Sequence, residues 1–297
     1  MMKRAKWLIA AATAMAVTGP SAAYNQWGSY HWATDGNGLT LTVERQITPV
    51  WGQFFNNSVS DWNASNKLNL TGAGANLGVS SKKCNPLSGK ALVCNDSYGF
   101  RGWLGIATIW ANGDHITQAT TKLNDSYFNT STYNHDDWRM LVACQEIGHD
   151  FGLDHQDETF DNYNLGTCMD YTNAPSGGVV GGFNYGPANL HPNSGDYDTL
   201  TYMYSHNDTT GGGGGGGGHG RPADAGPQAA DAFTFREVGK PTPGASAVVS
   251  PDWGRAIAFD ASGRPDTFQL DLGDGHRKIT HVFWVPGHRP VPENMRD

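Results

Sequence analysis

The sequence predicts an α+β fold with a mixed twisted sheet and one long helix in residues 24–208, followed by a small all-β domain in residues 232–297. The segment LTLTVERQ (39–46) alternates apolar and polar residues, as a half-buried strand does. Two apolar runs within residues 102–123, separated by the turn-forming ANGD, indicate a hairpin. A segment of helical periodicity, residues 134–152, follows these strands. Strands that precede a long helix are typical of an α+β domain.

A helix is expected directly after the first strand. Thr48 is a plausible N-cap, and Pro49 suits the first helical position, where its missing N–H costs nothing. Large apolar residues then recur at roughly helical spacing at Val50, Trp51, Phe54, Phe55 and Trp62. The hairpin that follows consists of GWLGIATIW (102–110) and HITQATTKL (115–123).

The long helix is expected in NHDDWRMLVACQEIGHDFG, residues 134–152. Cap-forming Asn and Asp residues stand at its start, and Gly152 can end it by adopting a left-handed conformation. Its apolar positions are Trp138, Leu141, Val142 and Ile147.

The clearest domain boundary is the glycine-rich stretch of residues 209–231. A run of glycine followed by alanine and proline cannot bury a core and is expected to act as a linker. Beyond it, AIAFDAS, DTFQLDL and KITHVFWV alternate as strands do, with GDG as a turn. We expect a small β meander with its own core of Phe268, Phe283 and Trp284.

The first 23 residues have the features of a secretory signal peptide. A basic start at Lys3, Arg4 and Lys6 precedes an apolar run from Trp7 to Val17, and small residues at 21–23 suit cleavage. We therefore expect a secreted chain, extracellular or periplasmic, that begins near residue 24. No later run is long enough to span a membrane.

The charge of the chain argues against nucleic acid as a partner. The formal net charge is −8, and removal of the signal peptide takes away three positive and no negative charges, which makes it −11. An acidic exported protein without a basic run is a poor candidate for binding nucleic acid. We expect a monomer.

Four cysteines in an exported chain most simply form two disulfides. The spacing favours Cys84 with Cys94 and Cys144 with Cys168, although the sequence leaves other pairings open. The second bond would covalently link the helix of residues 134–152 to a later turn.

A metal site is expected on this helix. Residues four apart lie on one helical face, so Gln145 and His149 can reach the same point, with Glu146 beside it. A left-handed turn at Gly152 allows His155 to return to that point from outside the helix. Three ligands plus an open position for water describe a catalytic zinc site, and the cofactor that we expect is therefore Zn²⁺.

The stretch CQEIGHDFGLDHQD resembles the metzincin clan of zinc endopeptidases. The clan pattern H-E-x-x-H-x-x-G-x-x-H is met at Glu146, His149, Gly152 and His155 and departs at Gln145. The resemblance implies that His149 and His155 hold zinc, that Glu146 is the general base, and that the substrate is a polypeptide.

The resemblance extends to other parts of residues 24–206. TCMDY (167–171) is similar to the methionine-containing turn of the clan, which implies Met169 under the metal and Tyr171 as a phenol that stabilises an oxyanion. Residues 102–110 would be the edge strand on which an extended substrate adds. SGDYDTLTYMY (194–204) would be the closing helix.

Gln145 leaves three interpretations open. Its amide oxygen can serve as a weaker zinc ligand, or water or another group can take its place, and the chain would then be a working endopeptidase. Alternatively, the chain has the metzincin fold but acts as a non-catalytic binding or interaction protein. A different metal hydrolase chemistry is the third interpretation. Possible substitute ligands are His115, His135 and His191.

Overall fold

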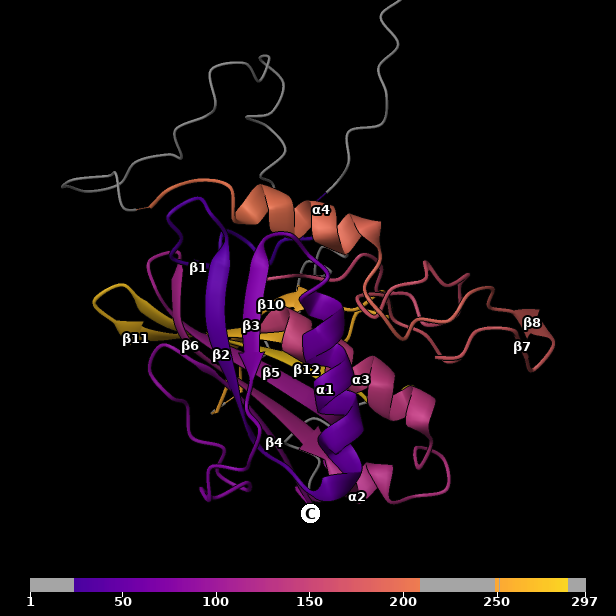
Figure 1. The fold of residues 1–297 in the computed structure, drawn as a ribbon. Helices are drawn as coiled ribbons and strands as arrows, with labels where there is room; N and C mark the ends of the chain where they lie inside the picture. Colours follow the sequence, from indigo (N-terminus) through magenta and orange to yellow (C-terminus); the bar gives the residue numbers. More distant parts are fainter. Residues whose placement is uncertain (1–23, 209–248, 251, 288–297) are drawn as a thin grey trace, which may run out of the picture.

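The computed structural model describes residues 24–208, 249–250 and 252–287, and they form a mixed β-sheet with helices packed against it (Figure 1). The expected signal peptide, the linker of residues 209–231 and residues 232–248 lie outside this part of the chain. The strands of the main sheet are β1 (His31–Trp32), β2 (Leu39–Gln46), β3 (Leu68–Gly72), β4 (Ala91–Asp96), β5 (Trp103–Asn112), β6 (His115–Asn124), β9 (Val249–Ser250), β10 (Gly254–Phe259), β11 (Pro265–Gly273) and β12 (His276–Trp284).

The remaining elements are helical, apart from a two-stranded arm. They are the 3-10 helix η1 (Pro49–Trp51), the helices α1 (Gly52–Trp62), α2 (Asp125–Phe128), α3 (Asp136–His149) and α4 (Ser194–Met203), and the strands β7 (Val179–Val180) and β8 (Phe183–Asn184). Figure 1 shows the β7–β8 arm projecting from the body of the molecule.

The sheet has a parallel half and an antiparallel half. Its order is β3-β2-β4-β6-β5-β12-β11-β10-β9, with β1 beside β6. The strands from β3 to β6 are parallel to their neighbours in this order, whereas every pairing from β6 through β5 to β9 is antiparallel. β5 therefore lies near the middle of the sheet, where the two halves meet.

Helices α1 and α3 pack together, and α3 lies against β5 (Figure 1). Gly105 on β5 permits this close approach, because a Cβ at that position would lie 2.7 Å from both Val142 Cγ1 and Glu146 Cγ. Any larger residue at 105 would push the helix away from the strand. The glycine thus sets the distance between Glu146 and β5.

Several predicted elements are confirmed. The strand of residues 39–46, the helix entered through Thr48 and Pro49, the hairpin and the closing helix are all present. The long helix differs at both ends, because His135 takes the N-cap position and α-helical geometry stops at His149, three residues before Gly152. Gly152 still has the expected left-handed conformation, with φ of 89°.

The expectation of a separate all-β domain is not confirmed. The three predicted strands are present as β10, β11 and β12, but β12 pairs with β5 along its whole length, from His276 opposite Asn112 to Trp284 opposite Trp103. The physical reason is that β5 offers an unpaired edge and apolar side chains on both faces. That residues 24–208 fold without this segment stays a prediction.

The expected separate core of this segment is also divided. Phe283 packs in the main hydrophobic core, together with Ile279 of the same strand. Phe268 and Trp284 instead form a small cluster with Trp103 and Ile106 of strand β5 and with Val282. The alternation of β12 thus places its side chains on both faces of the sheet.

Both disulfides in the structure have the pairing that the spacing favours. Cys84 is joined to Cys94, and Cys144 is joined to Cys168. The second bond connects α3 to the turn that contains Met169, and both of its cysteines are fully buried.

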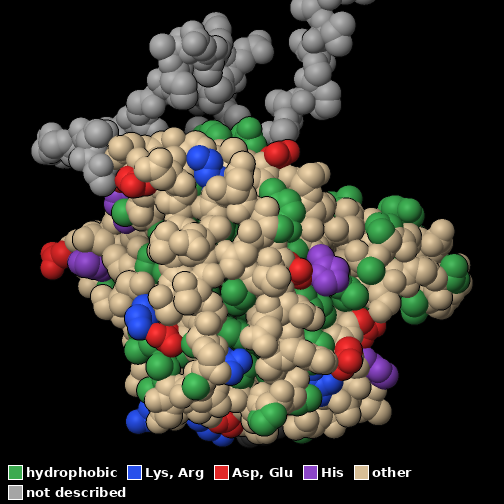
Figure 2. Space-filling view, viewed as in Figure 1, with side chains coloured by type: hydrophobic (Ala, Val, Ile, Leu, Met, Phe, Trp, Pro, Cys, Tyr) green, Lys and Arg blue, Asp and Glu red, His purple; other side chains and the backbone are tan. Residues whose placement is uncertain are grey.

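The surface of the described residues carries scattered charges. Figure 2 shows lysine and arginine side chains dispersed over the viewed face among many acidic and polar ones, without a basic patch. Among the helices in the described ranges, none is both long and apolar enough to cross a membrane.

Candidate metal centre

Helix α3 and the turn after it bring the expected ligands together. Gln145 and His149 lie one helical turn apart, and both side chains are buried. The chain then turns at Gly152, where a Cβ would lie 2.2 Å from the carbonyl oxygen of Tyr30, so the turn requires glycine. His155 returns toward the helix, and its ring centroid lies 4.8 Å from that of His149.

The rings of His149 and His155 are oriented by hydrogen bonds at Nδ1. His149 Nδ1 lies 2.8 Å from the carbonyl oxygen of Leu153, and His155 Nδ1 lies 3.4 Å from Glu158 Oε1. The Nε2 atoms of both rings are buried and have no hydrogen-bond partner among the described residues. A hydrogen bond at one ring nitrogen that orients the other is the usual arrangement around histidine ligands of metals.

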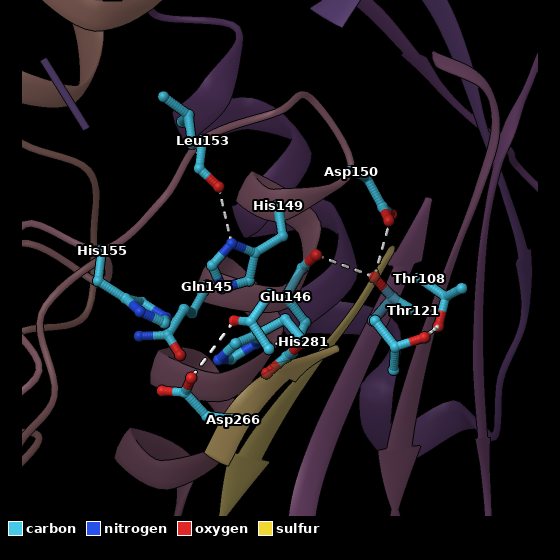
Figure 3. Close-up of polar contacts among 12 residues, drawn as sticks. Thr108, Thr121, Gln145, Glu146, His149, Asp150, Leu153, His155, Asp266 and His281 are labelled. Carbon is cyan, nitrogen blue, oxygen red and sulfur yellow. Dashed lines mark hydrogen bonds and ion pairs between the residues drawn. The ribbon is translucent and has the colours of Figure 1, made fainter. Parts of the chain in front are cut away.

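Gln145 is oriented in a similar way. Its Nε2 donates to the carbonyl oxygen of Cys168 at 2.7 Å, while its Oε1 is buried without a partner in the described part of the chain. Cys168 is itself joined to Cys144, the neighbour of Gln145. The disulfide and the hydrogen bond together hold the Gln145 side chain near His149 and His155 (Figure 3).

A third histidine joins this group from β12. One ring nitrogen from each of His149, His155 and His281 lies within 4.8 Å of the other two. The His281 ring is 1% exposed, and its centroid lies 4.2 Å from that of His149. Figure 3 shows His281 beside Gln145 and Glu146.

Sequence reasoning missed His281. The substitute ligands that it considered lie elsewhere: His115 begins β6, His135 precedes α3, and His191 pairs with Asp61 on the surface. The sequence pattern that could have identified His281 is the alternation of KITHVFWV, in which this histidine shares a strand face with Ile279 and Phe283. A histidine at a core-facing strand position needs a partner there.

Glu146 lies beside the histidines and is completely buried. Its Oε2 is 3.4 Å from His281 Nδ1, and its Oε1 is an unpartnered buried atom among the described residues. In the metal-free protein, burial raises the pKa of Glu146 well above its usual value, and the carboxyl group of Asp150 adds to this effect. A carboxyl group in such surroundings is suited to accept and release a proton.

The three imidazoles differ in protonation. Burial lowers the pKa of His149 well below its usual value, and the neighbouring His155 lowers it further. Burial likewise lowers the pKa of His281. At His155 burial also lowers the pKa, but hydrogen bonding to Glu158 and nearby carboxylates outweigh it, so the pKa is raised overall. His149 and His281 are therefore neutral, which is the form that binds metals.

Met169 and Tyr171 lie close to this group. A Cβ on Gly148 would be 2.8 Å from Met169 Sδ, so the methionine packs directly under α3. The Tyr171 ring centroid is 4.4 Å from that of His155. Its hydroxyl lies 2.7 Å from His281 Nε2 and 3.3 Å from Asp266 Oδ2. Both contacts of the hydroxyl come from the C-terminal segment.

The residues present fit a zinc ion. Four buried polar atoms without partners among the described residues belong to adjacent side chains: Gln145 Oε1, Glu146 Oε1, His149 Nε2 and His155 Nε2. An unpaired buried polar atom costs about 1–3 kcal/mol, so the atoms of Gln145, His149 and His155 call for a partner that the described residues do not supply. Imidazole nitrogens with an amide or carboxylate oxygen are a donor set that suits zinc.

Comparison with known proteins adds little to this geometry. No family model and no curated protein matches the chain. Among solved structures, the chain is similar to high choriolytic enzyme 1, a hatching enzyme zinc-protease of the medaka fish Oryzias latipes, at 8% sequence identity and a TM-score of 0.33. The match covers 59% of this chain and 94% of that one. A likeness at this level assigns no role to any residue of this chain.

Proposed function

We propose that this chain is a secreted zinc endopeptidase of metzincin type. The observation that carries the proposal is the group of buried, unpartnered atoms on Gln145, Glu146, His149 and His155. His149 and His155 would hold the zinc, and the third ligand would be either the amide oxygen of Gln145 or the imidazole of His281. The match of the sequence to the clan pattern at Glu146, Gly152 and His155 supports the same proposal.

The residues around the ion would each have a role in peptide hydrolysis. Zinc, when bound, lowers the pKa of a water molecule and polarises the carbonyl group that is attacked. Glu146 would take the proton of the attacking water on its carboxylate and deliver it to the leaving amine. Tyr171 would donate a hydrogen bond from its hydroxyl to the developing oxyanion, once that hydroxyl is released from His281 and Asp266.

The substrate would add as a strand to β5, and β12 occupies that edge in the structure. β12 also directs His281 between Glu146 and Tyr171, where the reacting groups of a substrate would have to lie. We therefore propose that the structure is a closed state of the enzyme. Opening would require β12 to leave β5, which frees the strand edge, Glu146 and the Tyr171 hydroxyl together.

A non-catalytic zinc protein is the second candidate, and one observation favours it. His149, Glu146, Tyr171 and His281 are each at most 1% exposed, so the group is enclosed. Structural zinc sites have closed coordination, whereas catalytic sites keep one position open. If His281 stays in place permanently, the fold holds zinc without hydrolysing peptides.

The proposal is tested by zinc content and cleavage together. We expect the mature chain to retain one more equivalent of zinc after gel filtration than its His149→Ala variant, because His149 is a ligand in either ligand set. The wild type should also cleave an unfolded protein, and the variant should not. Equal zinc retention by the two proteins would refute the metal centre, and zinc retention without cleavage would favour the non-catalytic candidate.

The third ligand is identified by comparing Gln145→Ala with His281→Ala. We expect the loss of a true ligand to weaken zinc binding at this centre, measured by competition with a chelator of known affinity. If Gln145 is the third ligand, Gln145→Ala should weaken zinc binding and His281→Ala should leave it within a few-fold of wild type. The reverse result would make His281 part of the permanent coordination.

A further inference from the structure

A second group of histidines lies away from the proposed zinc centre. His31 on β1 is the register partner of His115, the first residue of β6. His206 and Asp208 follow α4 and come back to the same place. Three segments that are far apart in the sequence thus contribute imidazole and carboxylate groups to one point.

The ligand atoms of this group converge. His206 Nε2 lies 3.0 Å from His31 Nε2 and 2.9 Å from Asp208 Oδ1. His31 Nε2 is 3.5 Å from Asp208 Oδ2. Two ligands of a tetrahedral zinc ion, each about 2.0–2.1 Å from the metal, are separated by about 3.3 Å. The three distances bracket this value. His115 Nε2 lies 3.4 Å from Asp208 Oδ1 but outside the group of three whose ligand atoms all lie within 4.8 Å of one another, so it would reach a fourth position after a shift of its partly exposed side chain.

The side chains are oriented by contacts outside the group. His31 Nδ1 lies 2.8 Å from the carbonyl oxygen of Ser29, so Nδ1 carries the hydrogen and Nε2 presents its lone pair to the group. Asp208 Oδ2 accepts a hydrogen bond from the backbone N–H of Thr34 at 2.8 Å, and Asp208 N–H donates to the carbonyl oxygen of Thr34 at 2.9 Å. The carboxylate is therefore fixed facing the imidazoles.

We propose that His31, His206 and Asp208 form a second metal site, which binds a divalent transition metal of the zinc class, with His115 as the fourth ligand. A bound ion would tie β1, the start of β6 and the chain after α4 to one another. Because protein side chains would fill all four positions around the ion, the site would be structural. Its residues are separate from those of the first centre.

The site is tested by counting zinc in the full mature chain. We expect the wild type to retain two equivalents after gel filtration, His206→Ala to retain one, His149→Ala to retain one, and the double variant to retain none. Asp208→Asn keeps the shape of the side chain and serves as the second variant if His206→Ala does not fold. His191→Ala is the matched control, since His191 also pairs with an aspartate but lies on the surface, and it should retain two.

Thermal unfolding gives a readout that does not depend on hydrolysis. We expect zinc to raise the Tm of His149→Ala, which lacks the first centre, and to have no such effect on the double variant with His206→Ala. If His206→Ala and Asp208→Asn retain as much zinc as the wild type, the second site is refuted. If the wild type retains one equivalent of zinc and only His206→Ala loses it, the second site is supported and the first is refuted. If only His149→Ala loses that equivalent, the first site is supported and the second is refuted.

Discussion

Replacement of Glu146 by Gln is expected to lower hydrolysis of an unfolded protein by about 10²–10⁴-fold, the usual contribution of a general base. The substitution keeps the size of the buried side chain and leaves His149 and His155 unchanged, so zinc retention should stay at the wild-type level. The measurement is kcat at equal zinc content. Loss of activity with retained metal separates proton transfer from ligation.

A matched control for this substitution is Glu44→Gln. Glu44 is also a buried carboxylate, but it pairs with Lys90 at 2.6 Å and lies outside the metal centre. We expect its substitution to leave kcat within a few-fold of wild type. If Glu146→Gln were as active as Glu44→Gln, peptide hydrolysis through Glu146 would be ruled out.

Removal of the C-terminal strands is expected to raise the rate of hydrolysis, whereas Glu146→Gln lowers it. A chain that ends at Asp231 lacks β12, so the edge of β5 and the Tyr171 hydroxyl become free. If the open state is about 0.1–10% populated in the full chain, complete opening raises the rate of hydrolysis by about 10–1000-fold. The rate is measured per equivalent of zinc, with circular dichroism to check that the shortened chain is folded.

A full-length variant tests the release of β12 from β5 even if the shortened chain does not fold. Thr280 lies opposite Thr108 in the pairing of β12 with β5, and Thr280→Pro removes a backbone donor from this strand. We expect Thr280→Pro to raise the rate of hydrolysis, as truncation does, but by a smaller factor. Leu272→Pro on β11, at an exposed position away from β5, is the control. Loss of both zinc and activity in the shortened chain would show instead that His281 is a permanent ligand.

The elements that sequence analysis predicted correctly have local causes. Pro49 at a helix start, glycines at turns and the alternation of residues 39–46 act within a few residues, and periodicity placed Gln145, Glu146 and His149 on α3. The same local logic applies to Gly152, whose left-handed turn returns the chain toward His155.

What could not be predicted depends on contacts across the chain. The partner of β5 is a strand more than 160 positions later, and no local pattern chooses between self-pairing of the C-terminal strands and addition to another sheet. His281 was missed for this reason, since its role exists only once β12 lies beside β5. The convergence of His31 with His206 likewise follows from the path of the chain after α4.

The pairing of β12 with β5 joins two parts of one chain, and this makes closure of the centre independent of protein concentration. Dilution does not separate them, because the contact is unimolecular. A single cut in residues 209–248 would turn the same contact into a bimolecular one, which weakens as the solution becomes more dilute. If β12 blocks the centre as proposed, cleavage by another protease would convert an intramolecular inhibitor into one that dissociates.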